Sequence, residues 1–431
     1  MKKFIKEINK SVDGGELYYL ESESTPVKFK NSKLYSIEHH ADKGIALRVI
    51  KDGKLGFSLT NRLEDTKTLL NNALETAKLG KEVKYKFPSP SRYRKNLKIW
   101  YSDVKALEVK NMVEIGHTIV DELSKKAPDL KIDVEMEKIE ENVRIINSSG
   151  LDLDYKKTYF SIFAVGFGLI ENSFTWIYDG FWGSRLPKSI SPILKTIIRL
   201  YKNSKKISQI TSGKMEVIFM PTVLPSLLRS FELGVNGKNI KKGTSPLKDK
   251  LGKKLLNKRV SIIDNPLREG AANTIPVDGE GIPTKKKFIF RDGRLENFIL
   301  DLDSASFLGM EPTGNGLRRG LSTPSPGTTN VEISPGDVSL NDMIKSVNDG
   351  LIIYGVLGGG QSNLLAGDFS VNVSLGFRIK SGEIIGRVKN TMVSGNVYEL
   401  FNNIKAISKG RKEFMGILTP AILFKNVNVT G

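Results

Sequence analysis

The sequence contains no cysteine and three histidines in 431 residues. The lack of cysteine excludes disulfides, thiolate zinc sites, iron–sulfur clusters and cysteine nucleophiles. His39 and His40 are adjacent, so on a strand they point to opposite faces. His117 lies on a helical stripe whose positions four residues away are Val113 and Asp121, not a second histidine. The sequence therefore assembles no histidine-based zinc site.

Long apolar runs are also missing, and none approaches the roughly 20 residues that a membrane helix needs. Residues 1–7 predict a short amphipathic helix and lack the apolar core of a signal peptide. The content of 39% hydrophobic and 26% charged residues is typical of a folded globular protein. We expect a cytoplasmic protein without a membrane segment.

The charge is one-sided, with 66 Lys and Arg against 47 Asp and Glu and a formal net charge of +19. The densest basic segment, residues 238–259, holds nine Lys and Arg and one acid. Nucleic-acid binding usually adds stacking aromatics or a groove-shaped helix, yet no aromatic residue lies between Phe231 and Phe288. We favour a solvated basic face and keep nucleic-acid binding through residues 238–259 as an alternative.

The length allows two domains, and the sequence patterns place the main boundary near residue 210. Residues 1–210 predict an α/β domain with hairpins and helices, interrupted by a linker at residues 84–95. Residues 211–431 predict an antiparallel, β-rich domain. The predicted fold class is α+β, because tight-turn hairpins favour antiparallel sheets; three such hairpins are at residues 44–60, 288–300 and 376–385.

Helices are predicted from apolar residues at helical spacing and from helix-stopping residues. We expect Thr222 to be the N-cap of one of them. A further helix is expected to continue to Ile407. The predicted helical segments are residues 63–79, 109–127, 192–201 and 222–234.

No catalytic serine is evident, because the chain lacks a G-x-S-x-G elbow and no base is identifiable beside Ser362 or Ser370. Acidic residues in the second half could hold a hard cation through oxygen ligands. We favour a turn role for them, since two lie in Asp-Asn-Pro and Asp-Gly-Glu-Gly turn sequences. These acids are Asp264, Asp278, Glu280, Asp301 and Asp303.

The segment at residues 355–370, GVLGGGQSNLLAGDFS, has the glycine content of a phosphate loop. It lacks the Gly-Lys-Ser/Thr of a P-loop and the third glycine of a dinucleotide loop, so the phosphate interpretation fails. Three consecutive glycines remove every Cβ from a short path and let another backbone approach closely.

Seven segments of the second half together resemble the TldD/PmbA family, and within it the PmbA branch, also called TldE. They include the glycine-rich segment, VDGEGIPT and MVSGNV. The resemblance covers the second half and, more loosely, the hairpin and helix near the N-terminus. The seven segments are residues 231–252, 260–266, 277–284, 288–302, 311–315, 355–370 and 392–407.

The resemblance implies a division of labour between two subunits. TldD subunits resemble zinc peptidases with a helix that carries two histidines around a glutamate, whereas the corresponding residues 222–232 here contain no histidine. We therefore expect no cofactor in this chain, zinc in a TldD-like partner, and unfolded or leader peptides as substrates. The alternatives left open are the nucleic-acid regulator and a lone hydrolase with oxygen ligands for its metal.

No catalytic or metal-binding residue is predicted in this chain. We expect a bound peptide to add as an extra strand beside the glycine run. Main-chain hydrogen bonds would hold it, and they do not depend on the side chains of the incoming peptide. The residues predicted to bind the peptide or the partner are Gly358, Gly359, Gly360, Gln361, Ser362, Asp368 and Ser370.

Overall fold

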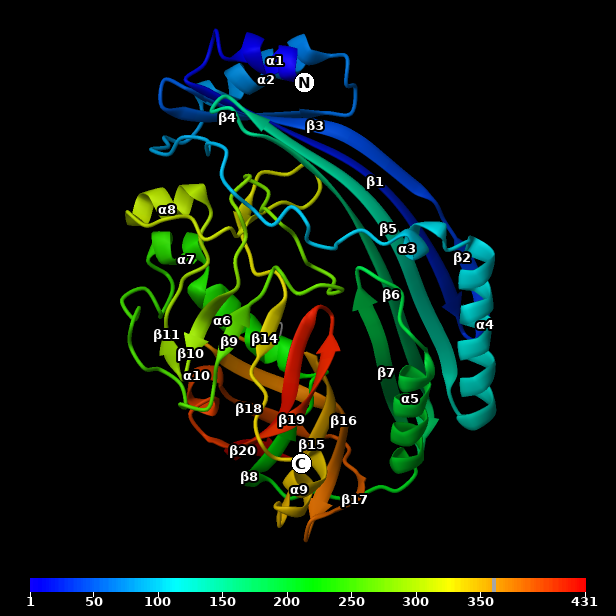
Figure 1. The fold of residues 1–431 in the computed structure, drawn as a ribbon. Helices are drawn as coiled ribbons and strands as arrows, with labels where there is room; N and C mark the ends of the chain where they lie inside the picture. Colours follow the sequence, from blue (N-terminus) through cyan, green and yellow to red (C-terminus); the bar gives the residue numbers. More distant parts are fainter. Residues whose placement is uncertain (359–361) are drawn as a thin grey trace.

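The computed structural model describes residues 1–358 and 362–431. Two β-sheets organise the chain, one built from its first half and one from its second half (Figure 1). This mixture of helices and strands confirms the predicted α+β class. In these two described stretches, no helix is long and apolar enough to cross a membrane.

The first half forms a seven-stranded sheet, here called the N-terminal sheet. Its strands are β1 (Gly14–Lys30), β2 (Lys33–Ile37), β3 (His40–Lys51), β4 (Lys54–Thr60), β5 (Lys131–Asn147), β6 (Asp152–Ile170) and β7 (Ser173–Gly183). They run in the order β4-β3-β1-β5-β6-β7, with β2 paired to β1. The predicted hairpin at residues 44–60 is confirmed as β3–β4, where Asp52 and Gly53 take positive φ angles of 50° and 71°.

Five helices accompany this sheet: α1 (Lys2–Ile8), α2 (Thr66–Lys78), α3 (Ser102–Ala106), α4 (Val109–Lys126) and α5 (Ser191–Ser204). Met112, Ile119 and Leu123 of α4 recur at helical spacing and are fully buried. They belong to one apolar cluster that joins α4 and α5 to β5 and β6. The two helices therefore cover one face of the N-terminal sheet, and its other face turns toward the second half of the chain (Figure 1).

The second half forms an eleven-stranded sheet, here called the C-terminal sheet. Its strands are β8 (Gly213–Phe219), β9 (Ile262–Asp264), β10 (Lys287–Arg291), β11 (Arg294–Leu295), β14 (Val331–Ile333), β15 (Asp349–Gly358), β16 (Asp368–Lys380), β17 (Glu383–Arg387), β18 (Met392–Asn396), β19 (Ile404–Phe414) and β20 (Ile417–Thr430). Strand β20 pairs with both β18 and β8, which closes β20, β18, β16, β15 and β8 into a ring. The other two predicted hairpins are confirmed as β10–β11 and β16–β17.

The remaining elements are α6 (Leu224–Val235), α7 (Gly237–Lys242), α8 (Leu302–Leu308), α9 (Leu340–Lys345), α10 (Val397–Leu400) and a small ladder of β12 (Gly316–Leu317) with β13 (Ser325–Pro326). Helix α6 packs its apolar side into the core of the C-terminal sheet. Its Phe231 ring lies 5.4 Å from the ring of Phe290 and 5.0 Å from that of Phe401. Edge-to-face packing of this kind fixes the orientation of α6.

Two helix predictions are wrong in detail. Thr222 is not the N-cap of α6, because the helix begins at Leu224 after Val223, with a proline in its first turn. The Thr222 hydroxyl instead donates to the carbonyl of Tyr354 in β15, at 2.6 Å. The helix expected to reach Ile407 ends after one turn of α10, and the following residues form β19, which pairs with β20.

Candidate functional site

A cleft of about 760 Å³ lies between the N-terminal sheet and the second half of the chain. Strands β1, β5 and β6 form one wall. Helix α6, the 316–329 segment and the β19–β20 turn form the other. The cleft lining includes Tyr18, Arg229, Glu232, Asn236, Arg318 and Arg319.

Helix α6 presents one face to this cleft. Arg229, Glu232, Leu233 and Asn236 follow helical spacing and all line it. The Glu232 carboxylate is ion-paired with Arg229 at 3.0 Å and accepts a hydrogen bond from the Thr328 hydroxyl at 3.0 Å. Catalytic zinc needs three good protein donors, and this face offers one carboxylate that is already bonded.

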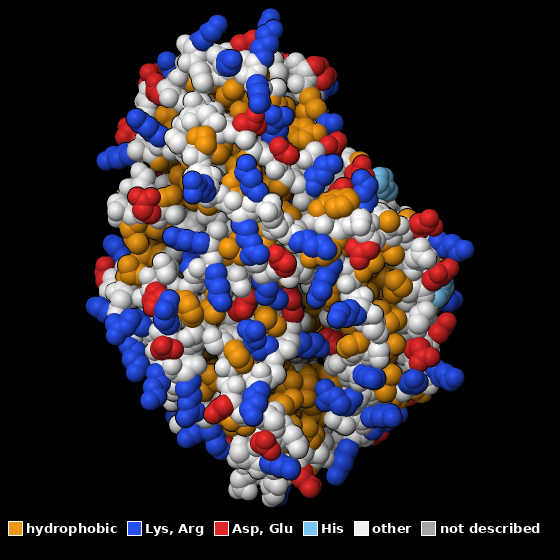
Figure 2. All heavy atoms as spheres, viewed as in Figure 1, with side chains coloured by type: hydrophobic (Ala, Val, Ile, Leu, Met, Phe, Trp, Pro, Cys, Tyr) orange, Lys and Arg blue, Asp and Glu red, His pale blue; other side chains and the backbone are white. Residues whose placement is uncertain are grey.

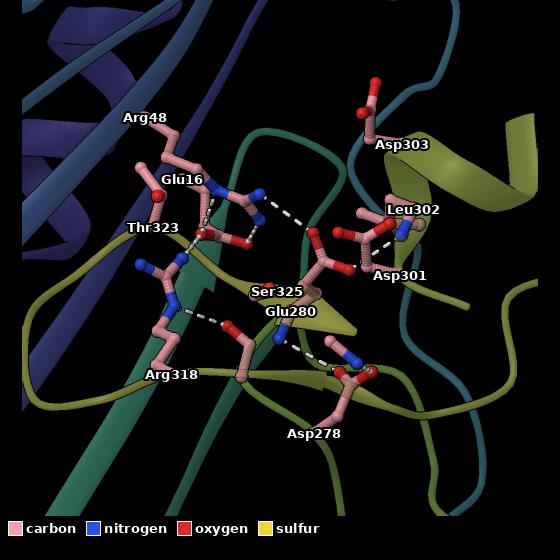
Figure 3. A network of polar contacts seen from close by, with 12 residues as sticks. Glu16, Arg48, Asp278, Glu280, Asp301, Leu302, Asp303, Arg318, Thr323 and Ser325 are labelled. Carbon is pink, nitrogen blue, oxygen red and sulfur yellow. Dashed lines mark hydrogen bonds and ion pairs between the residues drawn. The ribbon is translucent and has the colours of Figure 1, made fainter. Parts of the chain in front are cut away.

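A buried network of charges lies where the N-terminal sheet meets the cleft (Figure 3). Arg48 on β3 donates to both carboxylate oxygens of Glu16 on β1, at 2.9 and 2.8 Å, and to Glu280 at 2.8 Å. Arg318 forms a second ion pair with Glu16 and stacks 4.5 Å above the ring of Tyr18. The side chains of Glu16, Arg48 and Glu280 are at most 3% exposed. The network therefore ties the N-terminal sheet to the 277–284 and 316–329 segments of the second half through the interior.

The carboxyl groups of this network have shifted pKa values. Burial alone raises the pKa of Glu16, but the guanidinium groups of Arg48 and Arg318 outweigh it and hold the pKa below its ordinary value. Burial raises the pKa of Glu280, and Arg48 opposes the shift in part. Burial also raises the pKa of Asp278 to about 8, and the nearby Glu280 carboxylate adds to the effect.

The raised pKa of Asp278 predicts that folding stability falls as the pH rises. The folded protein holds this proton up to about pH 8, whereas the unfolded chain releases it near 3.8. Between these values the folded state binds more protons, so rising pH favours unfolding. Urea unfolding from about pH 4 to about pH 8 should show the decline. Asp278→Asn should flatten it, while the exposed control Asp154→Asn should not; equal slopes in both variants would contradict the assignment.

The predicted turn role of the acids of the second half holds for Asp278. Asp301 caps a helix, and Asp264, Glu280 and Asp303 instead form ion pairs with Lys or Arg. Asp278 accepts backbone N–H bonds from Glu280 and Ile282 at 2.9 Å, and Asp301 caps α8. Asp264 binds Lys287, Asn315 and Thr329, and Asp303 pairs with Lys81 and Lys241. In residues 1–358 and 362–431, no group of three or more His, Cys, Asp or Glu is placed to hold a metal ion.

The glycine-rich segment joins β15 to β16 away from the cleft lining. Gly358 ends β15 with a φ of 95°, and the Ser370 N–H donates to the Ser362 hydroxyl at 3.1 Å. The Asp368 carboxylate accepts from the Asn396 amide at 2.9 Å. Gly359, Gly360 and Gln361 lie outside the described residues. The peptide- or partner-binding role of all seven residues stays a prediction.

Comparison with known proteins decides the family. Residues 212–431 match the family described as PmbA/TldA metallopeptidase C-terminal domain, and residues 15–79 match domain 1 of the same metallopeptidases. The chain belongs to the TldD/PmbA family. An uncharacterized protein of Methanocaldococcus jannaschii is 29% identical over 99% of this chain and 98% of its own length. A metalloprotease PmbA homolog of Haemophilus influenzae is 24% identical over 94% of this chain and 89% of its own length.

Solved structures agree with this family membership. The crystal structure of TldE from Thermococcus kodakarensis matches all of both chains with a TM-score of 0.94 at 25% identity. A putative modulator of a DNA gyrase from Thermotoga maritima matches all of both chains with a TM-score of 0.91 at 24% identity, a likeness that shows the fold alone. The resemblance to the TldE branch is thereby confirmed.

Proposed function

We propose that this chain is a non-catalytic, TldE-like subunit that works with a TldD-like zinc peptidase on unfolded or leader peptides. The observation that carries the proposal is the cleft-facing side of α6, whose only carboxylate, Glu232, is bonded to Arg229 and Thr328. The family resemblance implies that, in the catalytic TldD subunits, the helix at the equivalent position carries the zinc-binding histidines. Zinc is expected in the partner, because the donor set of this helix does not fit the metal.

The histidines of the chain lie elsewhere. His40 begins β3 and pairs with Glu38 at 3.2 Å, and His39 contacts the Thr25 hydroxyl at 3.4 Å. His117 on α4 packs its ring edge-on against Phe29 at 5.1 Å. All three belong to the N-terminal sheet and its helix, whereas α6 packs on the C-terminal sheet. Their positions leave α6 without a histidine ligand, which supports the proposed non-catalytic role.

The exposed end of the β15–β16 hairpin is the proposed contact region for the peptide or the partner. Gly358, Asp368 and Ser370 are exposed there, and Ser362 is half-buried. An extended chain can add to such a strand end through main-chain hydrogen bonds, which suits unfolded peptides of varied sequence.

Peptide cleavage tests the proposal directly. An unstructured peptide of mixed sequence is incubated with this chain alone, with a TldD-type protein alone and with the two mixed in equal amounts. We expect cleavage by the mixture, abolished by a metal chelator and restored by zinc, and none by this chain alone. Chelator-sensitive cleavage by this chain alone would overturn the non-catalytic assignment.

The nucleic-acid alternative is not favoured. Part of the basic segment serves the internal structure: Lys241 pairs with Asp303 at 3.1 Å, and the Arg259 guanidinium donates to the Lys405 carbonyl at 2.7 Å. Several relatives carry the name metalloprotease. The lone hydrolase with oxygen ligands loses its support as well, because the candidate acids are already bonded to backbone N–H groups or paired with Lys and Arg side chains.

A further inference from the structure

A second, smaller cavity lies where α5 and β7 meet β8, β15, β16 and β19. Its volume is about 110 Å³, and its polar lining includes Tyr178, Arg199, Thr222, Tyr354 and Lys412. Arg199 also borders an outer groove of about 500 Å³ between α4 and α5. The outer groove therefore lies beside the inner cavity, and Arg199 lines both.

The lining of both spaces carries an excess of positive charge. Five cationic side chains face them, and two carboxylates nearby offset part of this charge: Asp179 pairs with Lys412, and Glu122 pairs with Lys126 at 2.8 Å. The other three cations form no ion pair with any described residue. The five cations are Lys126, Lys195, Arg199, Lys202 and Lys412. Lys and Arg side chains can be seen over this part of the surface in Figure 2.

Hydrogen-bond donors remain available inside the cavity. Arg199 donates one N–H to the Tyr354 hydroxyl at 3.3 Å, and its guanidinium lies 5.5 Å from the centre of that ring. Its other N–H groups have no partner in the described chain. The Tyr178 hydroxyl likewise has none there, and burial raises the pKa of Tyr178 to about 12, so it stays a donor at neutral pH.

We propose that this cavity binds the terminal phosphate of a phosphorylated small molecule, whose further phosphates lie in the outer groove. A phosphate group carries about two negative charges and three strong acceptor oxygens, which match a guanidinium, an ammonium and phenol donors. The inner cavity is far below the ~300 Å³ of ordinary ligand pockets, so it takes one such group and not a whole ligand. Because its walls come from both sheets, the ligand binds the N-terminal and C-terminal halves at once.

Binding of simple polyanions to the full chain tests this proposal. Calorimetry and the thermal unfolding midpoint are measured with inorganic phosphate, pyrophosphate and tripolyphosphate, with acetate and a single-stranded oligonucleotide as comparison ligands. Affinity should rise with the number of phosphates and fall with added salt. The proposal would be overturned if acetate bound as strongly as phosphate. It would also be overturned if the oligonucleotide bound and tripolyphosphate did not displace it.

Three variants locate the site. Arg199→Gln should weaken tripolyphosphate binding by about tenfold, the usual scale for losing one charged hydrogen-bonding partner. Tyr178→Phe removes only a hydroxyl and should weaken it by about threefold. Lys206→Gln, an exposed lysine just beyond α5 that lines neither space, should bind like the parent protein. Arg199 is exposed, so its variant should fold normally; unchanged binding by a folded Arg199→Gln protein would place the anion elsewhere.

Discussion

Replacing Arg48 with alanine is expected to lower the free energy of unfolding by about 3–5 kcal/mol, the usual loss when one partner of a buried ion pair is removed. Arg48 bonds both Glu16 and Glu280, and all three side chains are almost fully buried. Without the guanidinium, Glu280 loses its cation and Glu16 keeps only Arg318. Urea unfolding of the parent and variant proteins measures the difference.

A matched control on the same sheet is Arg144→Ala. Arg144 on β5 pairs with Asp152 in a similar two-bond geometry, at 3.0 and 3.2 Å, but its side chain is 37% exposed. An exposed pair of this kind contributes about 0.2–1 kcal/mol. The large loss at Arg48 should therefore come from burial and not from the removal of an arginine as such.

The pH dependence of the Arg48→Ala variant distinguishes the buried charges from lost packing. With the guanidinium absent, the carboxyl groups of Glu16 and Glu280 favour their neutral form, so the deficit should shrink as the pH falls below about 5. A deficit that stays constant with pH would mean that the lost side-chain volume dominates. A deficit equal to that of Arg144→Ala would show that the network does not hold the N-terminal sheet to the second half of the chain.

Turn chemistry and apolar spacing made much of the local fold predictable. Each of the three hairpins was predicted from a Gly preceded by Asp or Ser, and these residues do take the left-handed backbone angles. The stripe on α4 was readable because its buried residues recur at helical spacing. The start of α6 was misplaced by two residues, because the Thr222 hydroxyl bonds a neighbouring strand, a tertiary contact that local sequence does not encode.

The buried network could not be predicted, because its members are far apart in the chain. Glu16 and Glu280 meet at one arginine, although 264 positions separate them. One signal was present in the sequence, because Arg48 interrupts the apolar run at residues 45–50. In the structure, all six of these residues of β3 are buried. A charge within such a run needs a buried partner, yet the sequence does not say which of 47 acids supplies it.

The candidate site was predicted in part. The missing zinc donors of α6 were visible in the sequence, and the structure adds that this helix faces a cleft. The described residues among the predicted contacts, Gly358, Ser362, Asp368 and Ser370, lie at the end of the β15–β16 hairpin and do not line that cleft. The proposed peptide and partner contacts thus have two separate candidate surfaces, and mutating each in turn can separate their roles.

Replacing Arg387 with methionine is the second substitution with a large expected effect. Arg387 on β17 is 2% exposed and forms no ion pair within the described residues. Its guanidinium donates to the Ile170 carbonyl at 2.8 Å, to the Ser173 hydroxyl at 3.4 Å and to the carbonyl of Ser204 at 3.5 Å. Ser204 is the last residue of α5, where the helix dipole is negative. The cation thus joins the C-terminal sheet to the β6–β7 turn and to α5.

Methionine fills much of the same space but donates no hydrogen bond, so two buried carbonyls and the half-buried Ser173 hydroxyl lose this donor. An unsatisfied buried acceptor costs about 1–3 kcal/mol, and removal of the buried charge offsets part of the loss. We expect a net decrease of about 2–3 kcal/mol in the free energy of unfolding. Lys389→Met is the matched control, because Lys389 donates to the Glu171 carbonyl of the same turn from the surface. Its loss should stay within about 0.5 kcal/mol.

Hydrogen exchange shows whether the loss at Arg387 is local or shared by the two sheets. The main chain of Arg387 also forms two hydrogen bonds with the segment after α5. Its N–H donates to the Lys206 carbonyl, and its carbonyl accepts from the Ser208 N–H. If the guanidinium holds the sheets together, amides of α5 and of the β6–β7 turn should exchange faster in Arg387→Met. Those of β18 and β20, inside the C-terminal sheet, should change little. Faster exchange confined to β17 would mean that the main-chain bonds alone join the two halves, because they persist in the variant.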